Sequence, residues 1–285
     1  MPVSCESDSQ PYQRHEFRSL GQTRLLLLAP PHVSVSPAFR NQQYDPLRHA
    51  ELLAEMQRLR GAVYMEDGAI GRHELSADGR HRLEIDSDSW HLLAMDHAGT
   101  VTGCMRYREL DNSAGVHDLW IRHSALAASP FWGREFLSAV EAQICQARHR
   151  HVSYVEAGGW AIAPERRCTI QALRLVLATF GLGELLGGCI GITTATVKHC
   201  SSTILRRIGG SSLESPAGYL PPYYDPAFNC DMEVLWFDSA RPTPKYLPML
   251  NQLRREMSDI PVVCRSLPGL AWQAAGAQQN FGMYN

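Results

Sequence analysis

The sequence predicts an α/β (α+β) fold built as one large domain. Short apolar runs, typical of strands, alternate along the chain with segments whose apolar residues recur at helical spacing. Two of these runs are separated only by a tight turn, which predicts a β-hairpin. With 285 residues, of which 45% are hydrophobic, the chain can bury a sizeable core, and no linker divides it into two domains.

The first part of the chain predicts an extension, a strand and a helix. Residues 1–22 are polar and lack periodicity, so we expect a flexible N-terminal extension. The apolar run 24–29 is stopped by two prolines, which suits a first strand. Apolar residues then recur at helical spacing over 46–63, and Asp45 followed by Pro46 is typical of a helix N-terminus.

The next part of the chain predicts a hairpin between two irregular segments. Residues 69–82 are polar and contain glycine, so we expect a loop, which leads into the acidic segment 83–89. The hairpin strands are predicted over 90–95 and 101–110, and the apolar spacing of 131–150 predicts a helix.

The second half predicts alternating strands and helices. A strand beginning at Val152 runs to a turn at Pro164, and a long helix follows whose first turn holds residues 165–167. Residues 189–197 predict a further strand, and 198–208 a short helix that ends at a glycine pair.

The last part of the chain contains one more strand and one more helix. Residues 211–229 are rich in Pro, Gly and Tyr, and we expect them to form an ordered loop over a surface cleft. A strand is predicted over 232–238 and a helix over 246–257. We therefore expect a single domain over residues 23–257 and a C-terminal extension over 258–285.

Composition disfavours several classes of function. The net charge of −2 gives no long-range attraction to nucleic acid or an anionic membrane. The eight cysteines are dispersed without metal-binding spacing, which indicates reduced thiols and no metal site. No signal-peptide pattern and no membrane-spanning stretch is present, so we expect a cytoplasmic protein without an integral membrane segment. Nucleophile-elbow, zinc-protease and Walker motifs are also absent.

The stretch from Val152 to Gly187 is the strongest candidate for chemistry. An apolar strand carries one acidic residue, Glu156, and leads into a helix N-terminus with free backbone amides. This combines a proton acceptor with a cradle for an anion. The alternative is an ordinary strand, turn and helix with a Glu that faces solvent.

The order of elements over about residues 45 to 240 resembles the GNAT acyltransferase fold, which has a central mixed, mostly antiparallel sheet flanked by helices. GWAIAPERR, followed by a helix, resembles the family's central strand and acyl-thioester-binding turn. TTATVKHCSSTILRRIGG resembles its later strand and helix. LRGAVYMED, followed by LEIDSDSWHLLAMDHAGTVTGCMRYREL, resembles the subgroup of N-acyl amino acid synthases and acyl-homoserine-lactone (autoinducer) synthases.

The resemblance implies roles for individual residues. Glu156 matches the central-strand Glu that removes a proton, directly or through water, from the acceptor amine. Four residues match the positions that recognise the acceptor, with Asp88 in the same acidic loop: Arg60, Glu84, Asp86 and Arg106. Five residues of the central strand would hold the acyl thioester and its oxyanion: Gly158, Gly159, Trp160, Ala161 and Ile162. Five more match the phosphate-binding loop of the thioester donor: Arg166, Arg167, Thr169, Ile170 and Gln171.

Three departures from the family pattern affect the choice of substrates. Gly159 stands where the lactone synthases have an Arg, which disfavours homoserine lactone as the product. Thr169 or Ile170 stands where the phosphate loop has its first Gly, and the bulkier side chain narrows the approach to a pyrophosphate. This favours an acyl carrier protein, with its phosphopantetheine arm, over acyl-CoA as donor. Leu205 replaces the Tyr that often serves as general acid.

Three features of the sequence leave alternatives open. Arg60 and Arg106 lie in apolar runs and should meet carboxylates, either to staple the helix to the hairpin or to bind the acceptor. Seven basic residues would suit an acidic carrier protein if they share a face, or are solvated helix charges: Arg148, Arg150, Arg166, Arg167, Lys198, Arg206 and Arg207. The leucines and valine of 173–182 fill the core or line an acyl tunnel.

The resemblance therefore implies an N-acyltransferase without a permanently bound cofactor. It would move a fatty acyl group from an acyl carrier protein or acyl-CoA thioester to the amine of an amino acid or related small amine. An acyl-homoserine-lactone-type autoinducer synthase is the alternative within enzymes. A non-catalytic module that binds acyl thioesters is the alternative outside them.

Overall fold

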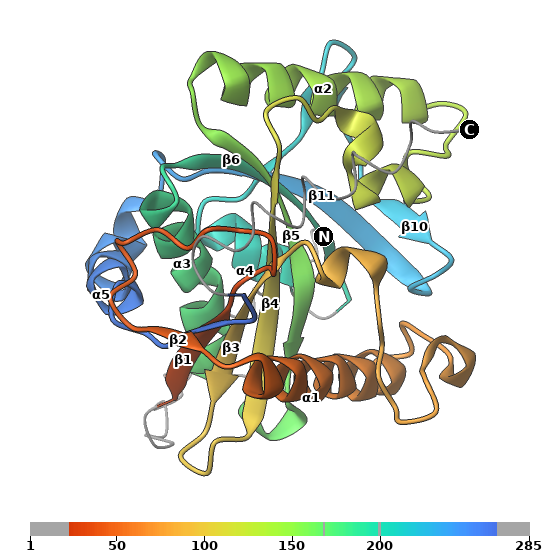
Figure 1. The fold of residues 1–285 in the computed structure, drawn as a ribbon. Coiled ribbons are helices and arrows are strands. Elements are labelled where there is room, and N and C mark those ends of the chain that lie inside the picture. The colour runs from red at the N-terminus through yellow and green to blue at the C-terminus, as the bar shows by residue number, and fades with distance from the viewer. Residues whose placement is uncertain (1–22, 168, 199–200, 267–285) are drawn as a thin grey trace, which may run out of the picture.

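The computed structural model describes residues 23–167, 169–198 and 201–266, and it shows one large sheet flanked by helices (Figure 1). The strand order is β10-β11-β6-β5-β4-β3-β1-β12-β2, with β7 paired to β11. Pairing is antiparallel except for β5 with β6, β1 with β12 and β12 with β2. The predicted mixed, mostly antiparallel sheet flanked by helices is confirmed.

The bounds of the elements follow the predicted order. The strands of the large sheet are β1 (Arg24–Leu28), β2 (Gln42–Tyr44), β3 (Trp90–Met95), β4 (Val101–Leu110), β5 (Ser153–Ile162), β6 (Cys189–Thr196), β7 (Ser211–Ser212), β10 (Tyr223–Asp225), β11 (Cys230–Asp238) and β12 (Val262–Cys264). The helices are α1 (Pro46–Glu66), α2 (Gly133–His149), α3 (Ile170–Leu185), α4 (Ser201–Arg207) and α5 (Leu247–Met257). A separate hairpin joins β8 (Glu214–Ser215) to β9 (Gly218–Tyr219).

Helices α1 and α2 cover one face of the sheet and leave a gap between them. Because successive strand residues point to opposite faces, Cys104, Arg106 and Arg108 of β4 share a face. Cys104 belongs to the apolar cluster under α1, whereas Leu110, on the same face, belongs to the cluster under α2. The arginines between them therefore lie where neither helix supplies apolar cover. Helices α3 and α5 pack on the opposite face, where the largest apolar cluster lies.

Three details differ from the predictions. The expected first turn of the long helix, 165–167, is wrong: a 3₁₀ turn spans Pro164–Arg166, and the side chain of Thr169 caps a new helix that begins at Ile170. The expected loop 211–229 contains short strands, because β10 pairs with β11. The sheet also includes β12, which lies beyond residue 257, where we ended the domain.

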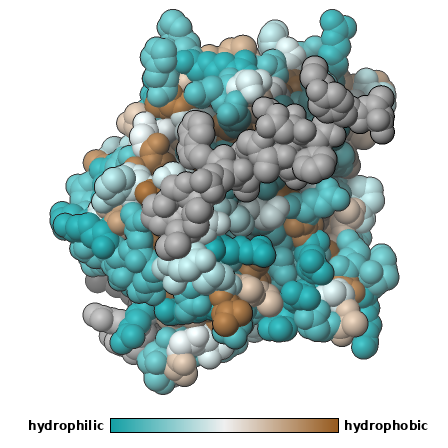
Figure 2. Space-filling view, viewed as in Figure 1, coloured by the Kyte–Doolittle hydropathy of each residue, from teal (hydrophilic) through white to brown (hydrophobic). Residues whose placement is uncertain are grey.

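The surface in Figure 2 is mainly hydrophilic on the side shown. On the face shown in Figure 2, hydrophilic side chains predominate, and the hydrophobic ones that are not covered form small separate patches. Within the three described segments, no helix has the length and apolar character needed to cross a bilayer. In the same segments, no group of three or more His, Cys, Asp or Glu side chains is arranged to hold a metal ion.

Candidate functional site

Strands β5 and β6 separate at Glu156. They pair in parallel from Ser153 opposite Cys189 to Glu156 opposite Ile192. Beyond this point β5 continues along β4, whereas β6 continues along β11. The two strands therefore form a fork, and the edges that face each other carry peptide groups without a strand partner.

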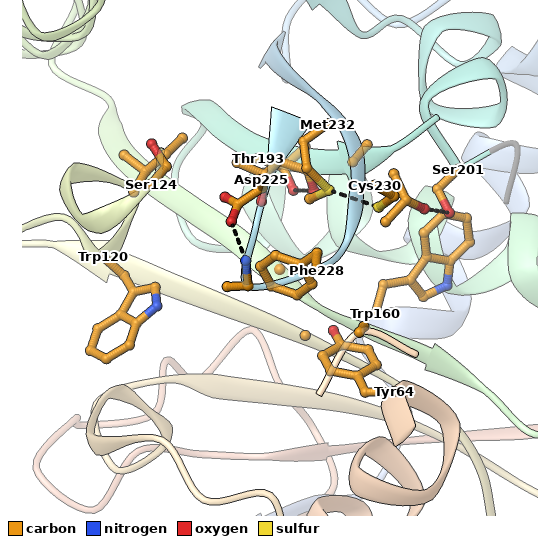
Figure 3. A pocket seen from close by; sticks show the side chains of 18 of the residues that line it. Tyr64, Trp120, Ser124, Trp160, Thr193, Ser201, Asp225, Phe228, Cys230 and Met232 are labelled. Atoms are coloured by element: carbon orange, nitrogen blue, oxygen red, sulfur yellow. Dashed lines mark hydrogen bonds between the residues drawn. The ribbon is translucent and has the colours of Figure 1, made fainter. Parts of the chain in front are cut away.

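A cavity of about 410 Å³ lies at the fork (Figure 3). Its wall is formed by α1, β4, β5, β6, the 3₁₀ turn Trp120–His123, and the segment around β10 and β11. Five of the predicted site residues line it: Arg106, Glu156, Gly158, Gly159 and Trp160. The volume is within the range of small-molecule sites, so the cavity can hold a small molecule.

A β-bulge shapes the wall of the fork. Cys104 pairs with Ala161 and Arg106 pairs with Gly158, so one residue of β4 faces two residues of β5. The extra residue is accommodated at Gly159, whose φ of 61° is in the left-handed region. The irregular strand expected from the glycines is present, and it presents Gly158 and Gly159 to the cavity.

Replacing Gly159 by Ala should destabilise the protein by about 1–2 kcal/mol, because a side chain in the left-handed conformation is strained. The new Cβ would also lie 3.3 Å from Cβ of Arg106. Gly99→Ala is the matched control, since Gly99 has a φ of 85° and nothing within 4 Å of an added Cβ. Chemical denaturation measures the free energy of unfolding of both variants. Equal losses would show that the contact with Arg106 does not add to the destabilisation.

Glu156 is buried at the branch point and is firmly positioned. The residue is 4% exposed. Its two carboxylate oxygens accept hydrogen bonds from the backbone N–H groups of Trp120, at 2.9 Å, and Ile121, at 2.7 Å. Nη1 of Arg108 lies 3.6 Å from the same carboxylate. Each oxygen retains a further lone pair with which it can accept a proton or a hydrogen bond. The alternative of a solvent-facing Glu is wrong.

Arg106 faces the same cavity without a counter-charge. It is 5% exposed, no carboxylate of the described residues lies within 4.0 Å of it, and its Nε has no hydrogen-bond partner there. Burial lowers the pKa of Arg106, and the negative charge of Glu156 opposes this effect. The expectation that Arg106 meets a carboxylate within the protein is therefore wrong for the described residues, because the register of β4 directs it to the cavity between α1 and α2.

Arg60 and Asp86 form a buried ion pair outside the cavity wall. Arg60 donates hydrogen bonds of 2.9 and 2.7 Å to Asp86, and both side chains are nearly inaccessible. Gln57 and the backbone of Leu83 also donate to Asp86. Burial alone would raise the pKa of Asp86, but the hydrogen bonds and charge of Arg60 lower it to about 2. Of the two alternatives, this arrangement favours a structural staple between α1 and the acidic loop.

The other two carboxylates of the acidic loop do not reach the cavity. Glu84 and Asp88 are exposed, and neither belongs to the cavity wall. Ala161 and Ile162, predicted to help hold the thioester, are buried and also lie outside the wall. Three of the five residues predicted to hold the thioester and one of the four predicted acceptor-binding residues therefore line the cavity.

The predicted phosphate loop is largely engaged within the protein. Arg167 pairs with Asp67 at 3.0 Å and with Glu66 at 3.6 Å. Gln171 is buried and donates to Oγ1 of Thr102 at 2.9 Å. Thr169 caps α3, Arg166 is half-buried, and Ile170 is 42% exposed. None of these residues lines the cavity, so a role in phosphate binding stays a prediction.

Several of the predicted basic residues also have intramolecular partners. Arg150 pairs with Asp238 and Arg206 with Glu233. Arg148 donates to the backbone carbonyls of Asn112 and Ala114. These contacts favour local structural roles for the three arginines over a shared docking face.

Important cavity residues were not predicted. Tyr64 and His81 come from the first helix and the loop after it, and their rings are tilted against each other with the centroids 5.6 Å apart. Burial raises the pKa of Tyr64 to about 12 and, with the charge of Arg60, lowers that of His81 to about 4. Asp225 and Phe228 come from the segment 211–229, whose predicted position over a cleft was the only sequence signal for them.

No family model and no curated protein sequence matches the chain. Among solved structures, it is similar to a CoA-dependent acyl-homoserine lactone synthase, BjaI, in a structure with SAM and isopentyl-CoA. The match has a TM-score of 0.52 at 14% identity and covers 90% of this chain and 100% of the synthase. This chain has the GNAT acyltransferase fold.

Two further structures resemble this GNAT-fold chain at lower scores. TofI, in a ternary complex with an inhibitor and MTA, has a TM-score of 0.49 at 16% identity, over 80% of this chain and 96% of TofI. FeeM, an N-acyl amino acid synthase from uncultured soil microbes, has a TM-score of 0.44 at 11% identity, over 77% and 93%. At these identities the likeness concerns the fold, and function depends on the cavity.

Proposed function

We propose that this GNAT-fold chain is an N-acyltransferase that moves a fatty acyl group from a carrier-protein or CoA thioester to the amine of an amino acid or related small amine. The observation that carries the proposal is the fork of β5 and β6, where one cavity contains Glu156 at the branch point and an unpaired Arg106. The fold similarity to an acyl-homoserine lactone synthase supports the same class of reaction.

The fork provides the groups that aminolysis of a thioester requires. Glu156 accepts the proton that the acceptor amine must lose before or as it attacks the thioester carbonyl carbon. Peptide N–H groups on the unpaired edge of β5 stabilise the oxyanion, and one well-placed donor contributes about 3 kcal/mol. Collapse of the tetrahedral intermediate forms the amide and breaks the carbon–sulfur bond. The thiolate is a good leaving group, which fits the presence of Leu205 where the family often has a Tyr.

Arg106 binds the carboxylate of an amino-acid acceptor. A bidentate guanidinium–carboxylate pair would satisfy the buried charge, which the described part of the protein leaves without a partner. The internal contacts of Arg167 and Gln171 disfavour a tight pyrophosphate site, so we propose a carrier protein as the preferred donor.

Replacing Arg106 by Met should weaken acceptor binding without loss of stability, because it removes an unpaired buried charge. We expect KM for an amino acid to rise about tenfold or more, as for the loss of a hydrogen bond to a charged group. KM for the amine that lacks the carboxyl group should stay unchanged. Arg58→Met, on an exposed part of α1, is the control. A similar rise for both acceptors would contradict carboxylate recognition.

The direct test follows thiol release from acyl carrier protein and acyl-CoA thioesters in the presence of a mixed amino-acid pool or SAM. Amine-dependent release and an N-acyl amino acid in the mass spectrum are the expected results. Release with SAM and a homoserine lactone product would instead identify an autoinducer synthase. Thioester binding without turnover would identify a non-catalytic module.

A further inference from the structure

The cavity contains a second buried carboxylate, that of Asp225. Four carboxylates are buried in the described part of the chain, those of Asp86, Glu156, Asp225 and Asp238. Three of them have an arginine within 4.0 Å. Asp225, which is 5% exposed, has no cation within that distance among the described residues.

The contacts of Asp225 leave much of its carboxylate available. Asp225 ends β10 and pairs with Cys230 of β11. Its Oδ1 accepts one hydrogen bond, of 3.0 Å, from the backbone N–H of Ala227. Lys198 lines the same cavity but lies more than 4.0 Å from the Asp225 oxygens. A buried carboxylate with one neutral donor is costly, and a cationic ligand would offset that cost.

Asp225 lines the cavity, and its negative charge acts on a neighbouring residue of the cavity wall. Burial, together with the charge of Asp225, raises the pKa of Tyr223. In Figure 3, Asp225 lies on the β10–β11 side of the cavity, and Tyr64 of α1 lies on the other side. The cavity thus has a buried cation, Arg106, from β4 and a buried anion, Asp225, from β10.

We propose that Asp225 binds the ammonium group of the acceptor and so makes the site selective for zwitterionic amino acids. This inference rests on the proposed function, in which Arg106 binds the carboxylate of the same acceptor. Aliphatic amines are protonated at neutral pH, so the acceptor enters the site as the ammonium ion. It loses one proton to Glu156 before it attacks the carbonyl carbon, and a second proton passes to the departing thiolate as the amide forms. Asp225 is a binding residue in this scheme, and Glu156 remains the proton acceptor.

Kinetics with an Asp225→Asn variant test the proposal. We expect KM for the amino-acid acceptor to rise about tenfold or more, because the hydrogen bond to a charged partner is lost. KM for the acyl thioester should stay within about twofold of the wild-type value, since the proposal assigns Asp225 to the ammonium group of the acceptor alone. Asp231→Asn, an exposed neighbour on β11, is the matched control and should behave as the wild type. An unchanged acceptor KM in Asp225→Asn would overturn the proposal.

Thermal unfolding provides a readout that does not require turnover. Each proteinogenic amino acid and the 2-hydroxy acid of the same carbon skeleton are added separately to the full chain. Greater stabilisation of the wild type by an amino acid than by its hydroxy acid, with this difference lost in Asp225→Asn, supports ammonium binding even if no thioester is turned over. Equal stabilisation of wild type and variant by an amino acid would refute ammonium binding, and so would the absence of any stabilisation of the wild type. Failure of turnover alone would refute the proposed reaction but not the site.

Discussion

Replacing Glu156 by Gln is expected to lower amine-dependent thiol release by about 10²- to 10⁴-fold, the usual contribution of a positioned general base. The amide cannot accept a proton from the amine, although it retains one oxygen that can accept a hydrogen bond from the turn at Trp120 and Ile121. Steady-state assays of thiol release at saturating thioester measure the loss as a fall in kcat.

A matched control separates chemistry from structure. Glu141 on α2 also accepts a backbone hydrogen bond, from Val116 at 2.9 Å, but it does not line the cavity. Glu141→Gln makes the same carboxylate-to-amide change, can keep its single backbone hydrogen bond through the amide oxygen, and should keep the wild-type activity. If Glu156→Gln binds thioester, unfolds near the wild-type temperature and still turns over at the wild-type rate, Glu156 is not the proton acceptor.

Replacing Asp86 by Asn is expected to reduce the free energy of unfolding by about 3–5 kcal/mol, because it leaves Arg60 buried without a counter-charge. The guanidinium of Arg60 is fully buried, so water cannot replace the lost carboxylate. The control is Asp259→Asn, which removes an exposed pair with Arg40 and should cost less than about 1 kcal/mol. Urea denaturation at neutral pH measures both variants, and equal losses would contradict the buried staple.

The Arg60–Asp86 pair also predicts how the free energy of unfolding changes at acid pH. The pKa of Asp86 is about 2 in the folded protein, below its ordinary value of 3.8. The folded state therefore binds fewer protons than the unfolded state in this range. The stabilisation is complete above about pH 4 and decreases as the pH falls towards 2. In Asp86→Asn this part of the acid dependence should disappear.

Local patterns were sufficient to predict most elements of the sheet and the position of Glu156. The strand with one acidic residue, the hairpin around the DHAGT turn and the long apolar helix each have a signal within a few residues. In contrast, β2 and β12 have three residues each, too few for a periodic pattern, and they join the sheet through pairing with distant segments.

The sequence predicted only part of the site, because the direction of each side chain there depends on the register of the strands. Arg106 was expected to meet a carboxylate because it lies in an apolar run, but the pleat of β4 directs it to the cavity. Asp225 lies 69 positions after Glu156, and only the pairing of β10 with β11 brings it to the same cavity. The backbone N–H groups that hold Glu156 cannot be recognised in the sequence, since every residue except proline carries a backbone N–H group.

The most direct test of the proposed reaction is mass spectrometry of lipids from bacterial cells that express the full chain. We expect a new species whose mass equals that of a fatty acid plus an amino acid minus one water, and we expect it to disappear with Glu156→Gln. Lipids identical to those of cells without the chain, although the protein is folded and abundant, would contradict N-acyl transfer at the fork of β5 and β6.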